Sequence, residues 1–219
     1  MKFSVIDELD RALREQRESN KREGLHVTHL VKCMRAVVYE LLGKKPEISN
    51  RSLRVFANGT STHLRLQYYA DKAGILVQKE VPIFDETLGL RGSADAILKK
   101  DDVYYVLEIK GVNTLEYKRI TEPREQDLDQ INMYMHYLKI KKGKILYENK
   151  NTQEQKEYDV EYDEKRVKKL LDKARKIIDM VNKKMIPARE YDPNVDWQCS
   201  YCPYSKYCLK DEIGGDNHN

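Results

Sequence analysis

The chain has 219 residues, of which 40% are hydrophobic and 35% are charged, and its formal net charge is +4. This composition suits one globular domain, or one domain with a small appendage, and excludes a disordered chain. No apolar run is long enough to cross a bilayer, and the first 20 residues read as a charged amphipathic helix rather than a signal peptide. We therefore expect a cytoplasmic protein with no membrane partner, whose mild positive charge permits nucleic-acid binding without requiring it.

The N-terminal part of the sequence reads as helical. Hydrophobic periodicity and capping residues predict helices over 3–20, over 28–42 and from about residue 50 to 73. Thr28 is expected to cap the second of these helices and Gly43 to end it, which places Cys33 in its second turn.

Three runs rich in β-branched and aromatic residues follow, at 75–84, 91–98 and 103–109. After them come a helix over 125–139, a second hairpin over 143–148 and 156–161, and a long helix over 163–185. This order predicts an α/β fold with a mixed central sheet flanked by helices. We divide the chain into an N-terminal helical segment 1–50 that contributes Cys33, a core 51–186, and a cysteine-rich tail 187–219.

The hairpin over 91–110 carries three ionisable residues, Asp95, Glu108 and Lys110. Because side chains alternate along a strand, Glu108 and Lys110 point to one face and Ile109 to the other. Carboxylates beside a lysine can form a hydrolytic site, in which the acids hold a hard cation and the lysine orients a water. A surface salt bridge on an exposed hairpin is the alternative that these three residues alone leave open.

The four cysteines of the chain are Cys33, Cys199, Cys202 and Cys208. In a reducing compartment such a cluster indicates metal ligation rather than disulfides. A fourth thiolate joining three close ones could hold zinc or an iron–sulfur cluster and would connect the N-terminal helices to the tail. Four unrelated buried thiols are the alternative.

Two helices add polar residues at one-turn spacing. His63 follows Gly59 by one turn, and Gln130 and Tyr134 share a helix face. Each pair alone fits an ordinary amphipathic helix, with packing or solvent contact as its role.

Taken together, the motifs occur in a fixed order: Gly59-x3-His63, Gly92-x2-Asp95, Glu108-Ile109-Lys110 and Gln130-x3-Tyr134, bracketed by one cysteine before and three after. In this respect the chain resembles the RecB-like branch of the PD-(D/E)xK nuclease superfamily. More narrowly, it resembles the CRISPR-associated protein four family of iron–sulfur exonucleases, over Cys33 to Cys208. The helicase–nuclease subunit AddB shares the cysteine bracket in a far larger protein.

The resemblance implies a role for each matching residue. His63, Asp95, Glu108 and the backbone carbonyl of Ile109 would bind Mg²⁺ or Mn²⁺, and Lys110 would position the attacking water. Gln130 and Tyr134 would hold the DNA strand, and a [4Fe–4S] cluster would be bound by Cys33, Cys199, Cys202 and Cys208. The expected activity is a metal-dependent exonuclease on single-stranded DNA or overhanging ends, 5′ to 3′, with CRISPR integrase proteins as partners and a homo-oligomer left open.

Three other interpretations remain open at this stage. The same nuclease could serve viral or phage recombination or replication, with unchanged catalytic residues. A cluster-stabilised module could bind DNA ends without catalysis. A zinc-stapled protein could carry the hairpin carboxylates as surface charges only.

Overall fold

The structure, a computed structural model, describes residues 3–20, 23–192 and 195–210. The ends of the predicted segments 1–50 and 187–219 therefore lie partly outside the described residues. Within the described part of the chain, no helix has the length and apolar character needed to cross a membrane.

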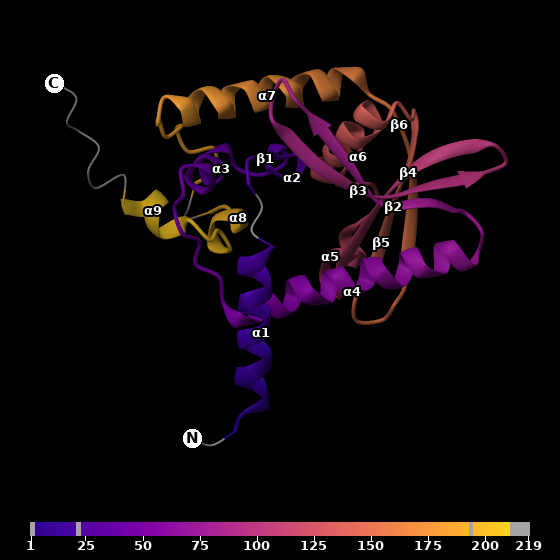
Figure 1. Ribbon diagram of the computed structural model, residues 1–219, viewed down its shortest axis with the longest axis horizontal. Helices are drawn as coiled ribbons and strands as arrows, with labels where there is room; N and C mark the ends of the chain where they lie inside the picture. Colours follow the sequence, from indigo (N-terminus) through magenta and orange to yellow (C-terminus); the bar gives the residue numbers. More distant parts are fainter. Residues whose placement is uncertain (1–2, 21–22, 193–194, 211–219) are drawn as a thin grey trace.

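Strands from the middle of the described chain form one six-stranded sheet (Figure 1). They are β1 (Leu25–His26), β2 (Leu76–Asp85), β3 (Leu90–Lys100), β4 (Val103–Val112), β5 (Lys142–Asn149) and β6 (Gln155–Glu161). The β2–β3, β3–β4 and β5–β6 pairs are antiparallel, and the β1–β3 and β4–β5 pairs are parallel. The predicted mixed sheet is confirmed. The two-residue β1 is too short to leave a pattern in the sequence.

Helices lie on both sides of this sheet (Figure 1). They are α1 (Val5–Ser19), α2 (Val27–Leu30), α3 (Met34–Leu41), α4 (Asn50–Lys72), α5 (Thr114–Arg119), α6 (Glu125–Leu138), α7 (Glu164–Asn182), α8 (Trp197–Ser200) and α9 (Ser205–Lys210). Helix α4 runs along one side of the sheet, and α6 and α7 lie on the other. The prediction of a sheet flanked by helices is therefore also confirmed.

The alternation of β4 distributes its side chains between two buried clusters. Leu107 and Ile109 belong to the smaller cluster, against which α4 packs through Leu66. Val106 and Val112 belong to the larger cluster, which includes the apolar faces of α6 and α7. Residues 108 and 110 share a side with 106 and 112, so the two ionisable side chains of β4 point toward α6.

Residues 28–42 do not form the single helix predicted from the sequence. Helix α2 ends at Leu30 and α3 begins at Met34, with Cys33 as its N-cap at φ −55° and ψ 124°, rather than in the second turn of a helix. The backbone N–H of Met34 donates to Glu190 Oε1 at 3.1 Å. This partner is 156 positions away, so no local pattern could signal the interruption.

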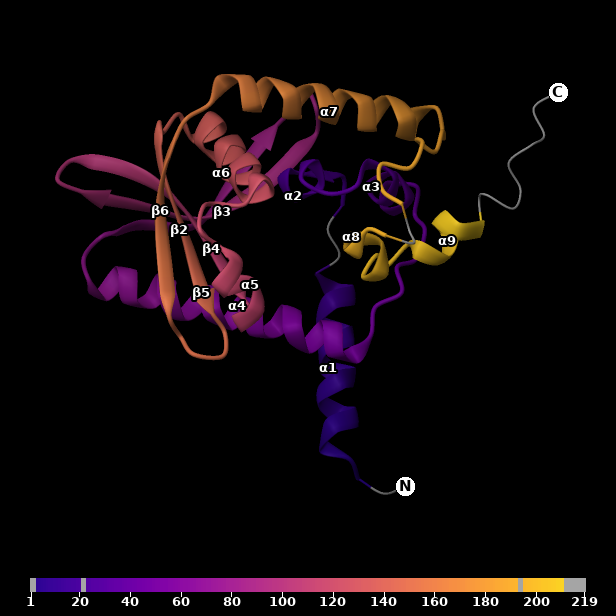
Figure 2. The same cartoon turned by 180° about the vertical axis from the view of Figure 1, so that it is seen from behind.

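The C-terminal tail lies beside α3, as both views show (Figure 2). Arg35 Nη1 donates to the carbonyl of Pro187 at 2.6 Å. The rings of Tyr39 and Tyr204 stack with centroids 6.3 Å apart. Segments from the two ends of the chain therefore pack together, next to the sheet and not within it.

Candidate active site

The candidate site forms where β3 and β4 separate. One edge of β3 pairs with β2 along 90–98. Its other edge pairs with β1 at Leu90 and Arg91 and with β4 at 96–100, which leaves 92–95 between the two partners. The edge of β4 that faces β3 is paired only as far as Leu107, while its opposite edge pairs with β5 from Val106 to Val112. Asp95 therefore lies at the opening between two diverging strands.

The carboxylate of Asp95 spans this opening. Its Oδ2 accepts a 2.6 Å hydrogen bond from the backbone N–H of Ile109, and its Oδ1 lies 3.2 Å from Nδ1 of His63. Gln67, one turn after His63 on α4, donates from Nε2 to the backbone carbonyl of Asp95 at 2.8 Å. Helix α4 thus contacts both the side chain and the backbone of Asp95. The structure brings His63, Asp95 and Ile109 together.

A carboxylate not singled out from the sequence, Glu80 of β2, also lies here. The ligand atoms of His63, Glu80 and Asp95 lie within 4.8 Å of one another. The flanking pairs Lys79↔Ala96 and Val81↔Ala94 place Glu80 opposite Asp95. Its φ of +49° is in the left-handed region, which is uncommon for a residue other than glycine. Counting residue pairs along both strands from the β2–β3 turn, beginning at Asp85↔Leu90, gives the register that places Glu80 opposite Asp95.

Glu108, Lys110 and Gln130 form a second group beside the first. Lys110 Nζ lies 2.9 Å from Glu108 Oε1 and donates to Gln130 Oε1 at 2.9 Å. Gln130 Nε2 donates to Glu108 Oε1 at 2.8 Å and to the Tyr134 hydroxyl at 3.4 Å. The four side chains predicted on β4 and α6 therefore meet in one hydrogen-bonded group. Asp127, one turn before Gln130, also lies 3.4 Å from Lys110 Nζ. Asp127 is not among the residues predicted from the sequence, although its helical spacing from Gln130 indicates that the two share a helix face.

Gly92 allows Tyr134 to approach the sheet. A Cβ at residue 92 would lie 3.0 Å from Tyr134 Cε1, 3.0 Å from Val27 Cγ2 and 3.2 Å from Ile83 Cγ1. These contacts are tighter than van der Waals packing allows, so any larger residue would displace the Tyr134 ring or its neighbours.

The charges of the site perturb one another. Burial and the nearby charge of Asp95 raise the pKa of Glu108 to about 8, although Lys110 acts to lower it. Burial acts to lower the pKa of Lys110, but the carboxylates of Glu108 and Asp127 outweigh it and raise that pKa above its usual range. Burial also acts to lower the pKa of His63. The hydrogen bond and the charge of Asp95 outweigh this effect, so the pKa of His63 is raised. Lys110 is therefore held protonated.

The donor atoms fit a divalent cation. Glu108 is 1% exposed, and its Oε2 is buried without a hydrogen-bond partner among the described residues. A buried carboxylate oxygen in that state is costly, and a cation would satisfy it. Carboxylate oxygens are the ligands that hard cations such as Mg²⁺ and Mn²⁺ prefer, and His63 adds one imidazole nitrogen to them. His63, Glu80 and Asp95 therefore form a set that suits Mg²⁺ or Mn²⁺, and the free Oε2 of Glu108 is a further donor outside that 4.8 Å group.

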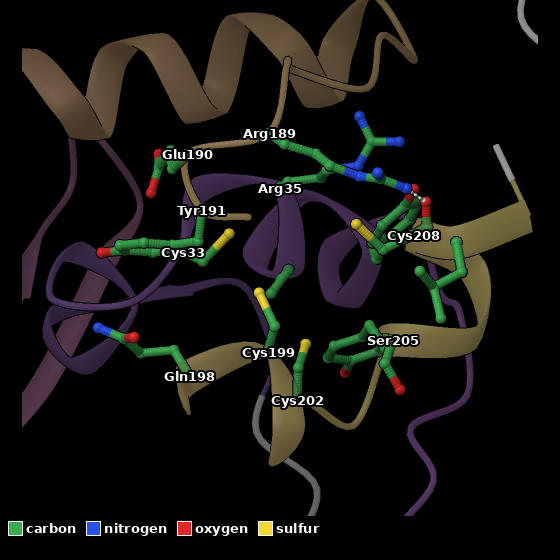
Figure 3. Close-up of a pocket in the computed structure, with 14 residues that line it drawn as sticks. Cys33, Arg35, Arg189, Glu190, Tyr191, Gln198, Cys199, Cys202, Ser205 and Cys208 are labelled. Carbon is green, nitrogen blue, oxygen red and sulfur yellow. Dashed lines mark hydrogen bonds between the residues drawn. The ribbon is translucent and has the colours of Figure 1, made fainter. Parts of the chain in front are cut away.

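All four cysteines line a separate cavity of about 50 Å³, between α3 and the tail (Figure 3). Figure 3 shows the four sulfur atoms around a common space, with Arg35 and Arg189 at its edge near Cys208. None of the four is in a disulfide, and burial raises the thiol pKa of Cys33, Cys199 and Cys202. In the described chain, only His63, Glu80 and Asp95 bring three ligand atoms within 4.8 Å. No three of the four sulfur atoms therefore lie within 4.8 Å of one another, whereas the sulfurs of a tetrahedral zinc site with Zn–S bonds of about 2.3 Å lie roughly 3.8 Å apart.

Two carboxylates and a lysine at the divergence of two strands define a candidate site for metal-dependent hydrolysis. The chain belongs to the PD-(D/E)XK nuclease superfamily, whose family model matches residues 5–209. No curated protein matches it in sequence.

The solved structures that share its fold include SSO0001 and LHK-Exo. The crystal structure of SSO0001 is 20% identical with a TM-score of 0.64, over 95% of this chain and 98% of that chain. LHK-Exo, an alkaline exonuclease from Laribacter hongkongensis, is 15% identical with a TM-score of 0.58, over 78% and 93%. LHK-Exo in complex with dAMP is 16% identical with a TM-score of 0.55, over 73% and 88%.

Proposed function

We propose that this protein is a metal-dependent exonuclease that degrades single-stranded or overhanging DNA, 5′ to 3′, in the cytoplasm. The observation that carries the proposal is the buried, unpartnered Oε2 of Glu108 beside Asp95 and Lys110. Membership of the nuclease superfamily supports phosphodiester hydrolysis. The likeness in fold to an alkaline exonuclease supports the choice of exonuclease over endonuclease.

In this proposal Asp95, Glu108, His63 and the carbonyl of Ile109 hold Mg²⁺ or Mn²⁺, and Glu80 is an additional donor. When bound, the cation would supply Lewis acidity that lowers the pKa of a water and neutralises charge on the phosphate. The 2.6 Å hydrogen bond from Ile109 to Asp95 fixes the position of that carboxylate before any substrate arrives.

Lys110 acts as a cationic donor in the same proposal. Its raised pKa means that it keeps its proton at neutral pH, so it orients the attacking water and stabilises phosphate charge instead of removing a proton. Gln130 holds Lys110 by a hydrogen bond and lies against Tyr134, and these two α6 residues hold the DNA strand.

The cysteine cavity is proposed to hold a [4Fe–4S] cluster, ligated by Cys33, Cys199, Cys202 and Cys208. The common cavity of the four thiols, no three of which lie within 4.8 Å of one another, favours a cluster over a single zinc ion. Its role would be structural, because the cavity joins α3 to the tail rather than opening onto Asp95. Anaerobically purified protein should be brown with visible charge-transfer absorption. A colourless, zinc-loaded protein would contradict this assignment.

The biological setting proposed is CRISPR adaptation, in which the enzyme trims spacer precursors beside integrase proteins. This part rests on the resemblance of the motif order alone. Copurification with integrase proteins would support it, and a gene neighbourhood of phage recombination functions would favour the viral alternative. Light scattering would test the homo-oligomer.

The deciding experiment is digestion of end-labelled single-stranded DNA with Mn²⁺. Wild type should release nucleotides from the 5′ end, while Lys110→Ala and Asp95→Ala should cleave on the order of 1,000-fold more slowly, at a residual rate that single-turnover assays measure. Lys99→Ala is a matched control, because Lys99 is on the same hairpin and pairs with Asp102 at the turn, 2.8 Å away. An inert wild type, or variants that degrade DNA equally well, would reject the nuclease. Binding of DNA ends without cleavage would favour the non-catalytic module.

A further inference from the structure

Asp127 is a buried carboxylate that the proposed mechanism does not yet use. It lies in the first turn of α6 and is 1% exposed. An ionised carboxylate at such a position is costly unless charged or hydrogen-bonding partners surround it. Its location, one turn from Gln130 on the same helix, puts it on the side of α6 that faces β4.

The two oxygens of Asp127 have different partners. Oδ2 accepts hydrogen bonds of 2.7 Å from Arg124 Nε and 2.7 Å from the Tyr147 hydroxyl. Oδ1 lies 3.4 Å from Lys110 Nζ. Arg124 and Tyr147 also contact each other. The backbone N–H of Arg124 donates to the Tyr147 hydroxyl at 3.1 Å, and the Arg124 guanidinium lies 5.4 Å from the centroid of the Tyr147 ring. One oxygen is thus fixed by two donors while the other is directed at the lysine.

Three side-chain acceptor oxygens lie around the amine of Lys110, two at 2.9 Å and one at 3.4 Å. These acceptors are Glu108 Oε1, Gln130 Oε1 and Asp127 Oδ1. Glu108 is assigned to the cation in the proposed function, on which this inference rests. Of the two carboxylates beside Lys110, Asp127 is therefore the one without a role at the cation.

We propose that Asp127 is a positioning residue that fixes the Lys110 amine for catalysis, with Arg124 and Tyr147 bracing its second oxygen. Residue 147 is paired with residue 110 in the β4–β5 ladder, so the brace comes from the strand next to the lysine itself. The result is a continuous set of contacts from the start of α6, through Asp127, to the reacting end of β4. A purely structural Arg124–Asp127 ion pair that stabilises the start of α6 is the competing explanation.

Asp127→Asn is the informative variant. The amide can keep its oxygen toward Arg124 and Tyr147 while it removes the charge and the acceptor that face Lys110. We expect kcat on single-stranded DNA with Mn²⁺ to fall about 10–100-fold, with KM changed less than about twofold, because a displaced catalytic group costs chemistry rather than binding. Asp129→Asn is the matched control, since Asp129 lies on the same helix and pairs with Arg166, 2.6 Å away. It should retain wild-type kcat.

A double-mutant cycle separates positioning from structure. If Asp127 acts through Lys110, adding Asp127→Asn to Lys110→Ala should cost nothing more in single-turnover rate. If Asp127 has a structural role only, Asp127→Asn should lower the single-turnover rate by the same factor in the wild-type and in the Lys110→Ala protein. That result would overturn the proposal. So would an Asp127→Asn variant with wild-type kcat. An inert wild type would instead reject the proposed function itself.

Tyr147→Phe keeps the test decisive if Asp127→Asn folds poorly. It removes one brace of Oδ2 and leaves every group on Lys110 in place. We expect kcat to fall about fivefold, the cost of one lost hydrogen bond, without a change in KM. Unchanged kcat in a normally folded Tyr147→Phe protein would contradict the bracing arrangement.

Discussion

The backbone N–H of Ile109 on β4 donates a 2.6 Å hydrogen bond to Oδ2 of Asp95 on β3. The β3–β4 ladder ends at the pair Ala96↔Leu107, so Asp95 lies one residue and Ile109 two residues beyond its last pair. A side-chain carboxylate therefore takes the place of the next backbone acceptor as the strands diverge. The same contact closes the ladder and fixes the orientation of the carboxylate that we assign to the cation.

Asp95→Asn should separate these two roles. The amide oxygen can still accept from Ile109, so the melting temperature should change by no more than about 3 °C, equivalent to about 1 kcal/mol. The loss of charge should lower nuclease activity on the order of 1,000-fold, because several kcal/mol of electrostatic stabilisation depend on the cation. Thermal unfolding and single-turnover DNA cleavage measure both. A large loss of stability with activity retained would contradict this assignment.

The pKa of Glu108 predicts how cation binding depends on pH. Asp95, Lys110, Asp127 and Gln130 surround this carboxyl, and burial and Asp95 raise its pKa to about 8. Cation binding requires the ionised form, so Mn²⁺ affinity should rise about tenfold per pH unit below pH 8 and level off above it. Calorimetric titration from pH 6 to 9 tests this. Glu108→Gln should bind weakly with a flatter profile, and an unchanged slope in that variant would rule out Glu108 as the source.

The same pKa has a consequence for stability without divalent cations. Glu108 is raised above its usual pKa, so its contribution to folding is fully present below about pH 4.5 and is lost as pH rises through about 8. The melting temperature of wild type should therefore fall relative to Glu108→Gln over that window. Excess Mg²⁺ should reduce the difference, because binding to the folded state stabilises it.

The central sheet and its flanking helices were predictable because alternating and helical periodicities are local properties of the sequence. The position of Cys33 could not be predicted from local periodicity, because the break before α3 involves a contact with Glu190 from the tail. Glu80 required the β2–β3 register, which the turn at 86–89 encodes but which no motif marks. Asp127 shares its helix face with Gln130, yet its value as a contact of Lys110 depends on how α6 packs on β4. The roles assigned to the remaining site residues stay predictions.

Gly92→Ala tests the close packing of Tyr134 against the sheet. The new methyl group would meet the Tyr134 ring and Val27 at 3.0 Å each, so we expect a destabilisation of about 1–3 kcal/mol and reduced activity through the displaced tyrosine. Gly59→Ala is the matched control, because that position in α4 has no neighbour within 4 Å of a built Cβ. There, alanine should stabilise the helix by about 0.5–1 kcal/mol. Urea unfolding of both variants decides between these outcomes.

Cys33→Ala tests whether the cysteine cavity holds a cluster that joins the two ends of the chain. Cys33 lines the cavity together with the three cysteines of the tail, so its loss would remove the ligand that α3 contributes and leave only contacts such as the Met34 N–H to Glu190 bond. We expect the visible absorption to disappear and the melting temperature to fall by about 5–10 °C, because metal binding to the folded state adds several kcal/mol of stability. Ser205→Ala, in the same cavity lining but without a thiol, should keep both properties. An unchanged spectrum and melting temperature in Cys33→Ala would remove Cys33 from the ligand set.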